Sequence, residues 1–287
     1  MFRELPQFLR PDDCLVLNDS KVFPSRLFGH RVGFSGAVEV LLVQPISSDA
    51  KTWAALVHPG RKLRTGERVV LDGAEAEVIG RGTFGERTLR FHYDGDLYGL
   101  FQKIGHVPLP PYIKRADTAA DRERYQTVFA RETGSVAAPT AGLHFTPEIL
   151  EACRQAGAGI AYVTLHVGLG TFQPVRGETL HSERFQVSEE NAAKIRAAPR
   201  VICAGTTSVR AVESLYLGKS GETDLFIRPG FQFQRTGAML TNFHLPESSL
   251  LMLVCAFAGR KFVLAAYEHA VTAGYRFYSY GDCMLIV

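Results

Sequence analysis

Residues 200–217 read RVICAGTTSVRAVESLYL, and this stretch decides the fold class. The apolar run at 200–204 predicts a buried strand, which passes through a glycine and three hydroxyl residues into a predicted helix. Val209 and Val212 recur at helical spacing and mark the side of that helix that faces a core. A strand followed at once by a helix is the building unit of α/β proteins.

The same alternation extends outward from this stretch. Further strands are predicted at 13–17, at 159–167 and near 275–280, and further helices at 188–197, 248–258 and 261–273. The sequence therefore predicts an α/β fold of mixed α+β character, with at least partly parallel strands.

A different pattern occupies the region from about Arg26 to Pro110. Short apolar runs recur there at roughly 8–12-residue spacing, separated by glycine, proline or aspartate, as in a small antiparallel barrel or sandwich. Asp72-Gly73 is the clearest hairpin turn. We predict an inserted β-barrel domain at 27–110 and a discontinuous α/β domain formed by 1–26 and 111–287.

The composition excludes several other classes. With 46% apolar and 21% charged residues, the 287-residue chain is neither disordered nor of low complexity. The five cysteines form no CxxC pair, which argues against a disulfide framework and favours buried thiols in a reduced, cytoplasmic protein. No apolar run reaches the ~20 residues of a membrane span, so no membrane partner is expected. A net charge of +3 permits an RNA partner without requiring one.

The turn before the helix of the opening stretch is the first candidate site. It aims unpaired N–H groups and the hydroxyls of Thr206, Thr207 and Ser208 at one point, which suits an anion. The helix dipole disfavours Arg210 in a first turn, so we expect it to bind a carboxylate, a phosphate or Glu213. A plain capped helix is the alternative interpretation. The P-loop spacing is absent, which disfavours a nucleoside triphosphate.

The second candidate site is the small-residue segment PTAGLH at 139–144. It precedes a predicted helix, whose start is marked by Thr146-Pro147-Glu148. A backbone without bulky side chains lets a ligand approach closely, and His144 is placed for acid–base chemistry. Alternatively, His144 caps or packs the loop.

The strand at 159–167 leads to the third candidate. Its alternation places Thr164 and His166 on one face. The GLG turn that starts at Gly168 lacks the third glycine of a dinucleotide fingerprint, and Pro174 interrupts the helix that should follow, so a Rossmann site is rejected. Two interpretations remain: a strand-end turn over a ligand, and a polar-faced edge strand.

The fourth candidate is LTNFHLPESSL at 240–250, which gathers Asn242, His244 and Glu247 before a buried helix. These residues offer a hydrogen-bond donor, a base and an acid. The histidines form no HExxH motif, so no metal site is predicted. The basic run HPGRKLRTGER at 58–68 offers charge to phosphates, although a solvated hairpin face is the simpler interpretation.

Together these segments resemble one family, the S-adenosylmethionine:tRNA ribosyltransferase-isomerases. The resemblance rests on blocks that occur in the family's order: LVLNDSKVFPSRLFG at 15–29, GHVPLPPYIKR at 105–115, DRERYQTVFA at 121–130, GSVAAPTAGLHFT at 134–146, VTLHVGLGTFQPV at 163–175, AGTTSVRAVES at 204–214, LFIRPGFQF at 225–233, LTNFHLPESSLLMLVCAFAG at 240–259 and YRFYSYGDCMLI at 275–286. Blocks this long and ordered are highly specific.

The resemblance implies a fold and a reaction. The fold is a distorted α/β barrel-like domain with an inserted all-β barrel. The enzyme transfers the ribosyl part of S-adenosylmethionine to the aminomethyl group of 7-aminomethyl-7-deazaguanine, at the wobble position of tRNA with a GUN anticodon. The product is epoxyqueuosine, and adenine and methionine leave. S-adenosylmethionine is consumed as a substrate, no cofactor or metal is implied, and we expect a monomer.

This chemistry needs a base, a proton for the departing adenine and a neutral amine, and histidine suits such steps near pH 7. We therefore expect His144, His166 and His244 to be catalytic. The residues expected to bind substrate are Thr140, Gly168, Thr171, Thr206, Thr207, Ser208, Arg210, Asn242 and Glu247.

Two departures from the family pattern support alternative hypotheses. The usual N-terminal segment is absent from the sequence, and the stretch between Pro174 and Glu183 is a few residues short and lacks an Asp-His pair. One alternative is a non-catalytic relic that binds tRNA or a nucleotide. Another is an enzyme of this fold that acts on a different substrate derived from S-adenosylmethionine.

Overall fold

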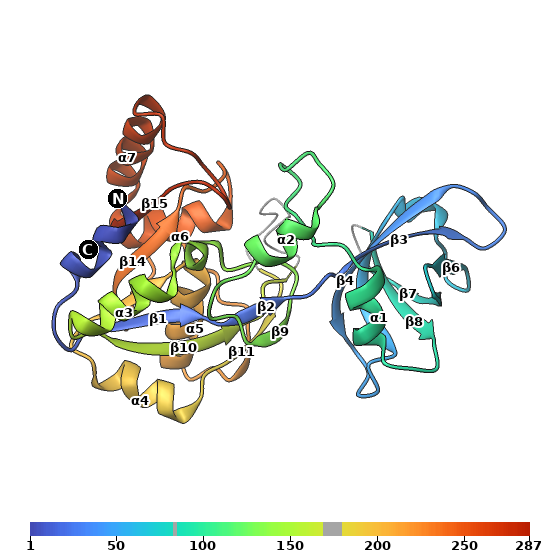
Figure 1. Ribbon diagram of the computed structural model, residues 1–287, viewed down its shortest axis with the longest axis horizontal. Coiled ribbons are helices and arrows are strands. Elements are labelled where there is room, and N and C mark those ends of the chain that lie inside the picture. The colour runs from blue at the N-terminus through green and yellow to red at the C-terminus, as the bar shows by residue number, and fades with distance from the viewer. Residues whose placement is uncertain (83–84, 169–179) are drawn as a thin grey trace. The chain divides into compact units, whose positions relative to one another are not determined.

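The computed structural model describes residues 1–82, 85–168 and 180–287, and the chain divides into two compact units (Figure 1). The first unit contains Met1–Lys21, Gln126–Thr133 and Ala138–Val287. The second contains Val22–Tyr125 and Gly134–Ala137. The mixed α/β fold with an inserted barrel is confirmed, and the second unit continues past the predicted boundary at residue 110.

A seven-stranded sheet forms the centre of the first unit, in the order β13-β11-β10-β1-β12-β14-β15. Its four parallel strands are β10 (Gly159–Leu165), β1 (Cys14–Asn18), β12 (Val201–Ala204) and β14 (Thr236–Asn242). Strands β11 (Glu183–Gln186) and β15 (Cys283–Ile286) pair antiparallel with β10 and β14. The edge strand β13 (Gly221–Thr223) pairs antiparallel with β11. A separate pair joins β2 (Ser20–Val22) to β9 (Glu132–Ser135).

The central strand β1 is buried along its whole length because helices cover both of its faces. Leu15 and Leu17 pack on one face against the 3-10 helix η1 (Phe2–Phe8) and helix α3 (Pro147–Gln155). Alternation turns Val16 to the opposite face. There α4 (Glu189–Ala197) and α5 (Thr206–Tyr216) contact the strand.

Local sequence signals set most helix starts. Thr146, Ser188 and Ser248 each accept a hydrogen bond from a backbone N–H in the first turn of α3, α4 and α6 (Ser249–Ala258). Gly259, with φ +85°, separates α6 from α7 (Arg260–Thr272). Within the described residues no single helix is long and apolar enough to cross a membrane, and only the pair α6 and α7 passes that test together, with a bend of 115°.

The strand predicted near 275–280 is wrong. That segment is a turn, in which the backbone N–H of Arg276 donates to Asp282 and Tyr278 has φ +71°. The strand lies further on, at Cys283–Ile286, where it pairs with β14. Strand β14 itself was not predicted, since its polar end was taken as part of a loop.

The second unit is built on a closed antiparallel barrel. Its strands, in barrel order, are β3 (Arg26–Arg31), β4 (Ala37–Pro45), β5 (Thr52–His58), β8 (Glu86–His92), β7 (Ala74–Arg81) and β6 (Arg68–Leu71). A short 3-10 helix, η2, spans Gly60–Lys62. The predicted hairpin turn at Asp72-Gly73 is confirmed, with Leu71 paired to Ala74 and Gly73 at φ +82°. Trp53 is fully buried against Phe101 of α1 (Leu97–Ile104).

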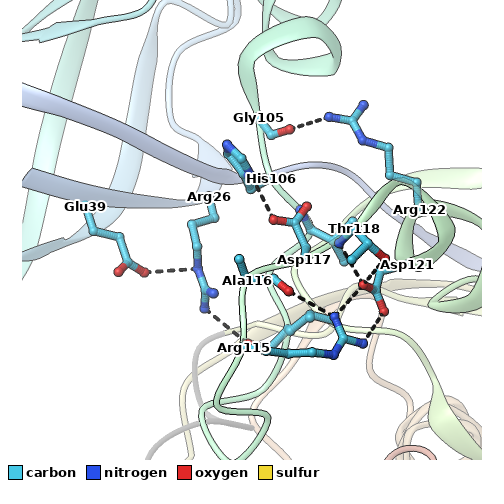
Figure 2. A network of polar contacts seen from close by, with 12 residues as sticks. Arg26, Glu39, Gly105, His106, Arg115, Ala116, Asp117, Thr118, Asp121 and Arg122 are labelled. Atoms are coloured by element: carbon cyan, nitrogen blue, oxygen red, sulfur yellow. Dashed lines mark hydrogen bonds and ion pairs between the residues drawn. The ribbon is translucent and has the colours of Figure 1, made fainter.

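A polar network extends this unit beyond the barrel (Figure 2). Arg26 on β3 bonds both to Glu39 at 3.0 Å and to the carbonyl of Leu109 at 3.1 Å. His106 Nδ1 lies 2.7 Å from a carboxylate oxygen of Asp117. These bonds attach the chain after α1 to strand β3, which explains why the unit runs past residue 110.

The same network fixes the short helix α2 (Ala119–Arg124). Arg115 donates two hydrogen bonds to the buried Asp121, at 2.7 and 2.8 Å, and this pairing holds the pKa of Asp121 well below its usual range. Arg122 donates to the carbonyl of Gly105 at 2.6 Å (Figure 2). The sequence blocks 105–115 and 121–130, on which the family resemblance partly rests, therefore contact each other here and stabilise the fold.

Candidate functional site

The four parallel strands of the first unit end together, at Asn18, Leu165, Ala204 and Asn242. Strands β10 and β12 lie on opposite sides of β1, so the chain order reverses at this point of the sheet. In open α/β sheets, ligands bind at the carboxyl ends of the strands at such a reversal. We call this the carboxyl edge, and most of the predicted site residues lie on it.

The start of α5 lies at the carboxyl edge beyond β12. The helix begins at Thr206, and Gly205 before it has φ 92° and ψ 152°. A Cβ on Gly205 would lie 3.5 Å from that of Ala141, so the 3-10 helix η3 (Thr140–His144) packs on the turn. The PTAGLH and AGTTS segments, distant in sequence, therefore meet.

The hydroxyl residues of this turn differ in their partners. Ser208 is fully buried and donates to the carbonyl of Ala204 at 2.7 Å, while Thr206 is buried too. The hydroxyl oxygen of Thr207 is buried and has no hydrogen-bond partner among the described residues. A buried polar atom without a partner is costly, so the Thr207 hydroxyl is the one in this turn whose hydrogen bonding the described residues leave unexplained.

Arg210 is not in the first helical turn, because α5 starts two residues before the predicted position. The dipole argument for a bound anion therefore fails. Its guanidinium instead forms an ion pair with Glu183 and donates to the carbonyl of Leu225 at 3.0 Å. Glu213, the alternative partner, accepts from the backbone N–H groups of 234–236. Arg210 thus binds a carboxylate of the protein itself.

A small cavity adjoins this ion pair. Its volume is about 30 Å³, and His181, Glu183 and Arg210 line it together with apolar residues of α6. A cavity of about 10–15 Å³ already holds a water molecule, so this one has room for water beside the ion pair of Arg210 and Glu183.

His144 lies at the end of η3, where it meets the carboxyl end of β14. Its Nε2 is 3.3 Å from the amide nitrogen of Asn242, which also donates to the carbonyl of Tyr278 at 3.1 Å. The ring of Phe2 stacks on the imidazole at 5.1 Å. Asn242 is buried, and its amide oxygen is without a partner in the described part of the chain.

Burial lowers the pKa of His144, with a further lowering by Arg276 and an opposing effect of Asp282. The imidazole is therefore neutral near pH 7. The alternative interpretation, a histidine that only packs the loop, accounts for the contact with Phe2 but not for the unpaired oxygen beside it.

His244 follows β14 and is held from two sides. Its Nε2 lies 2.7 Å from the hydroxyl of Thr241, and its backbone N–H donates to the hydroxyl of Tyr267 at 2.9 Å. Burial lowers the pKa of His244 to about 4. Glu247, by contrast, is exposed at φ +57°, and no contact places its carboxylate with His144 or His244 among the described residues.

His166 follows the end of β10. Its backbone N–H donates to the carbonyl of Arg184, burial lowers its pKa to about 4, and its Nδ1 is buried without a described partner. Gly168 N–H donates to Glu183 at 2.7 Å. Because β10 lies between β1 and β11, the edge-strand interpretation is wrong. Thr171 lies outside the described residues.

Two polar residues at the end of β1, Asn18 and Asp19, were not among the candidate site residues expected from the sequence. The side-chain amide of Asn18 bonds to both the N–H and the carbonyl of Leu165. Asp19 is 7% exposed and accepts a hydrogen bond from Thr164 at 2.7 Å. Burial raises the pKa of Asp19 despite that bond. Two polar residues directly after the apolar run CLVL at 14–17 were the signal that could have identified it.

Neither the cysteines nor a metal-binding cluster adds a reactive group to the described part of this site. All five cysteines are free, and burial raises the pKa of Cys14 and Cys153 to about 11, so these thiols are unreactive. Within residues 1–82, 85–168 and 180–287, no group of three or more His, Cys, Asp or Glu side chains is arranged to hold a metal ion.

The fold and this edge define a class: an α/β protein with an inserted β-barrel, whose candidate site residues lie at the carboxyl ends of parallel strands. The sequence profile described as "Queuosine biosynthesis protein" matches residues 1–286. The chain belongs to that family.

Named relatives extend the match. The chain is 64% identical to the S-adenosylmethionine:tRNA ribosyltransferase-isomerase of Solibacter usitatus and 48% identical to that of Trichlorobacter lovleyi, covering 100% of this chain and 88% of each relative. The crystal structure of S-adenosylmethionine tRNA ribosyltransferase from Thermotoga maritima matches with a TM-score of 0.52 and 37% identity, over 99% of this chain and 86% of that one.

The alignment with the Solibacter relative runs over 310 positions, more than the 287 residues of this chain. The relative therefore has residues that this chain lacks. The predicted shortening between Pro174 and Glu183 falls largely within 169–179, outside the described residues.

Proposed function

We propose that this protein is an S-adenosylmethionine:tRNA ribosyltransferase-isomerase of queuosine biosynthesis. One observation carries the proposal: the chain aligns over its full length, at 64% identity, with a relative of that name. Identity at this level over the whole chain favours the active enzyme over the non-catalytic relic.

In the proposed reaction, the ribosyl part of S-adenosylmethionine passes to the aminomethyl group of 7-aminomethyl-7-deazaguanine in tRNA. A base removes a proton next to the sulfonium, the bond to adenine breaks, and methionine leaves as epoxyqueuosine forms. We further propose that the tRNA has a GUN anticodon, and that the protein acts as a cytoplasmic monomer without a metal or cofactor.

The carboxyl edge offers groups for these steps. Burial lowers the pKa of His166 and His244 to about 4, so both rings are neutral near pH 7 and each has one nitrogen that can accept a hydrogen bond. The raised pKa of the buried Asp19 also suits a proton acceptor. Thr207 offers an unpaired hydroxyl for hydrogen bonding to substrate.

The direct test is adenine release from S-adenosylmethionine, followed by chromatography. Release with tRNA that carries the deazaguanine precursor, and none with the same tRNA carrying guanine, would support the proposal. A folded protein that releases no adenine with either tRNA would refute it. Equal release with both tRNAs would favour a different acceptor.

A further inference from the structure

The hydrogen bonds of Asn242 determine which nitrogen of His144 carries the proton. The amide nitrogen of Asn242 lies 3.1 Å from the carbonyl oxygen of Tyr278. A carbonyl oxygen only accepts, so the amide group must turn its NH2 toward it. The same NH2 lies 3.3 Å from Nε2 of His144. Because NH2 only donates, Nε2 must be the unprotonated nitrogen of the neutral ring.

The surroundings of the ring keep it in this neutral state. Phe2 stacks on it with an interplanar angle of 28°. Burial is the largest effect and lowers the pKa of His144, and Arg276 lowers it further. Asp282 raises the pKa, but by less than burial lowers it. The neutral ring therefore carries its one proton on Nδ1.

Nδ1 of His144 is available to a ligand. Nδ1 has no hydrogen-bond partner among the described residues. It is also not fully enclosed, since it is absent from the buried atoms without a partner, so a ligand can reach it. With the Nε2 lone pair already accepting from Asn242, the ring has only the Nδ1–H left to offer. In this arrangement His144 can donate a hydrogen bond but cannot accept a proton from substrate.

We propose that Asn242 is a positioning residue that fixes the Nδ1–H tautomer of His144, so that His144 serves as a neutral hydrogen-bond donor and not as the base. The inference rests on the proposed function, because that function supplies the group that accepts the hydrogen bond from His144. This group is a substrate nitrogen or oxygen that gains negative charge as adenine departs. The proton stays on His144, as in other sites where a neutral imidazole polarises its partner. Removal of the proton next to the sulfonium then belongs to another group.

The discriminating variant is Asn242→Asp, which keeps the size of the side chain and removes its donor. A carboxylate beside Nε2 accepts a hydrogen bond from it, so the proton moves to Nε2 and the pKa of His144 rises. A merely structural Asn242 would leave the tautomer unchanged.

The tautomer is measured by long-range 1H–15N NMR of the imidazole rings, with His144 assigned by comparison with His144→Gln. We expect a protonated Nδ1 and an unprotonated Nε2 in the wild-type protein at pH 7.5, and the reverse or a doubly protonated ring in Asn242→Asp. A protonated Nε2 in the wild-type protein overturns the inference, and this spectrum decides even if the variant does not fold.

Kinetics provide the second readout. Asn242→Asp should lower kcat for adenine release about 100-fold, the scale for loss of one preorganised donor, with little change in KM. His269→Gln, on an exposed position of α7, is the matched control and should keep the wild-type rate. An unchanged kcat in Asn242→Asp contradicts the inference. If the wild-type protein releases no adenine, the proposed function is refuted. The tautomer of His144 is then still decided by the NMR spectrum.

Discussion

Arg210 on α5 and Glu183 on β11 form an ion pair in which both side chains are more than nine-tenths buried. The other carboxylate oxygen of Glu183 accepts from the N–H of Gly168, just after β10. One carboxylate thus connects the end of β10 with the helix that follows β12.

Removing one partner of this pair should destabilise the protein severely. A charge left alone in a buried position costs about 3–5 kcal/mol, so we expect Arg210→Met to lower the free energy of unfolding by that amount. The double variant Arg210→Met, Glu183→Leu should recover much of the loss. Urea denaturation provides the measurement. If Arg210→Met keeps full stability but loses affinity for S-adenosylmethionine, Arg210 binds substrate and the structural assignment is wrong.

Stability should fall as the pH falls below about 6.5. The pKa values of His166 and His244 are about 4 in the folded protein, against 6.5 for free histidine. Between these values the unfolded chain binds protons that the folded chain does not, so each histidine lowers stability by up to about 1.4 kcal/mol per pH unit. Above the unfolded value both states are neutral and the effect vanishes.

Urea titrations between about pH 7.5 and pH 5 test this linkage. The variant His166→Gln, His244→Gln lacks both groups and should show a shallower slope than the wild-type protein. Equal slopes for the two proteins would contradict the assignment of neutral buried histidines.

Asp19→Asn should stabilise the protein at neutral pH while slowing the reaction. Because burial raises the pKa of Asp19 in the folded protein, folding disfavours its ionised form. This penalty builds up as the pH rises from the unfolded value of 3.8 to the folded pKa, and it is present in full above that. The amide removes the penalty. If Asp19 accepts a proton in the reaction, adenine release should fall about 100-fold. A variant that is less stable and fully active would assign Asp19 to structure alone.

Gly205→Ala should cost about 1–3 kcal/mol, because φ 92° with ψ 152° is a region that only glycine enters readily. A Cβ there would meet the Cβ of Ala141 at an ordinary 3.5 Å, so the cost comes from the backbone and not from a clash. Gly36→Ala, with open space around it and no positive φ, is the control and should be neutral. Equal melting temperatures for the two variants would contradict this account.

The elements that could be predicted from the sequence are those marked by a periodic pattern of apolar residues or by turn-forming residues. The β-barrel strands, the hairpin at Asp72-Gly73 and helices α4 to α7 follow from local patterns of apolar residues and turn formers. The residues that surround Gly205 also gave the correct order of strand, turn and helix, with a start two residues too late.

Pairings between distant residues could not be predicted in the same way. Arg210 and Glu183 are 27 residues apart and meet only because β11 returns beside β10. Asn242 reaches His144 across 98 residues because β14 and η3 end at the same edge. The hydrogen bond that Asp19 accepts from Thr164 could not be predicted, because Thr164 lies on β10, 145 residues further along the chain.

The central claim is ribosyl transfer to a tRNA base, and nucleoside analysis of the product tests it most directly. The protein is incubated with S-adenosylmethionine and tRNA that carries 7-aminomethyl-7-deazaguanine, and the digested tRNA is examined by mass spectrometry. We predict conversion of the precursor nucleoside to epoxyqueuosine by the wild-type protein, and at least about 100-fold less by His144→Ala. Precursor that persists unchanged with folded wild-type protein would contradict the account.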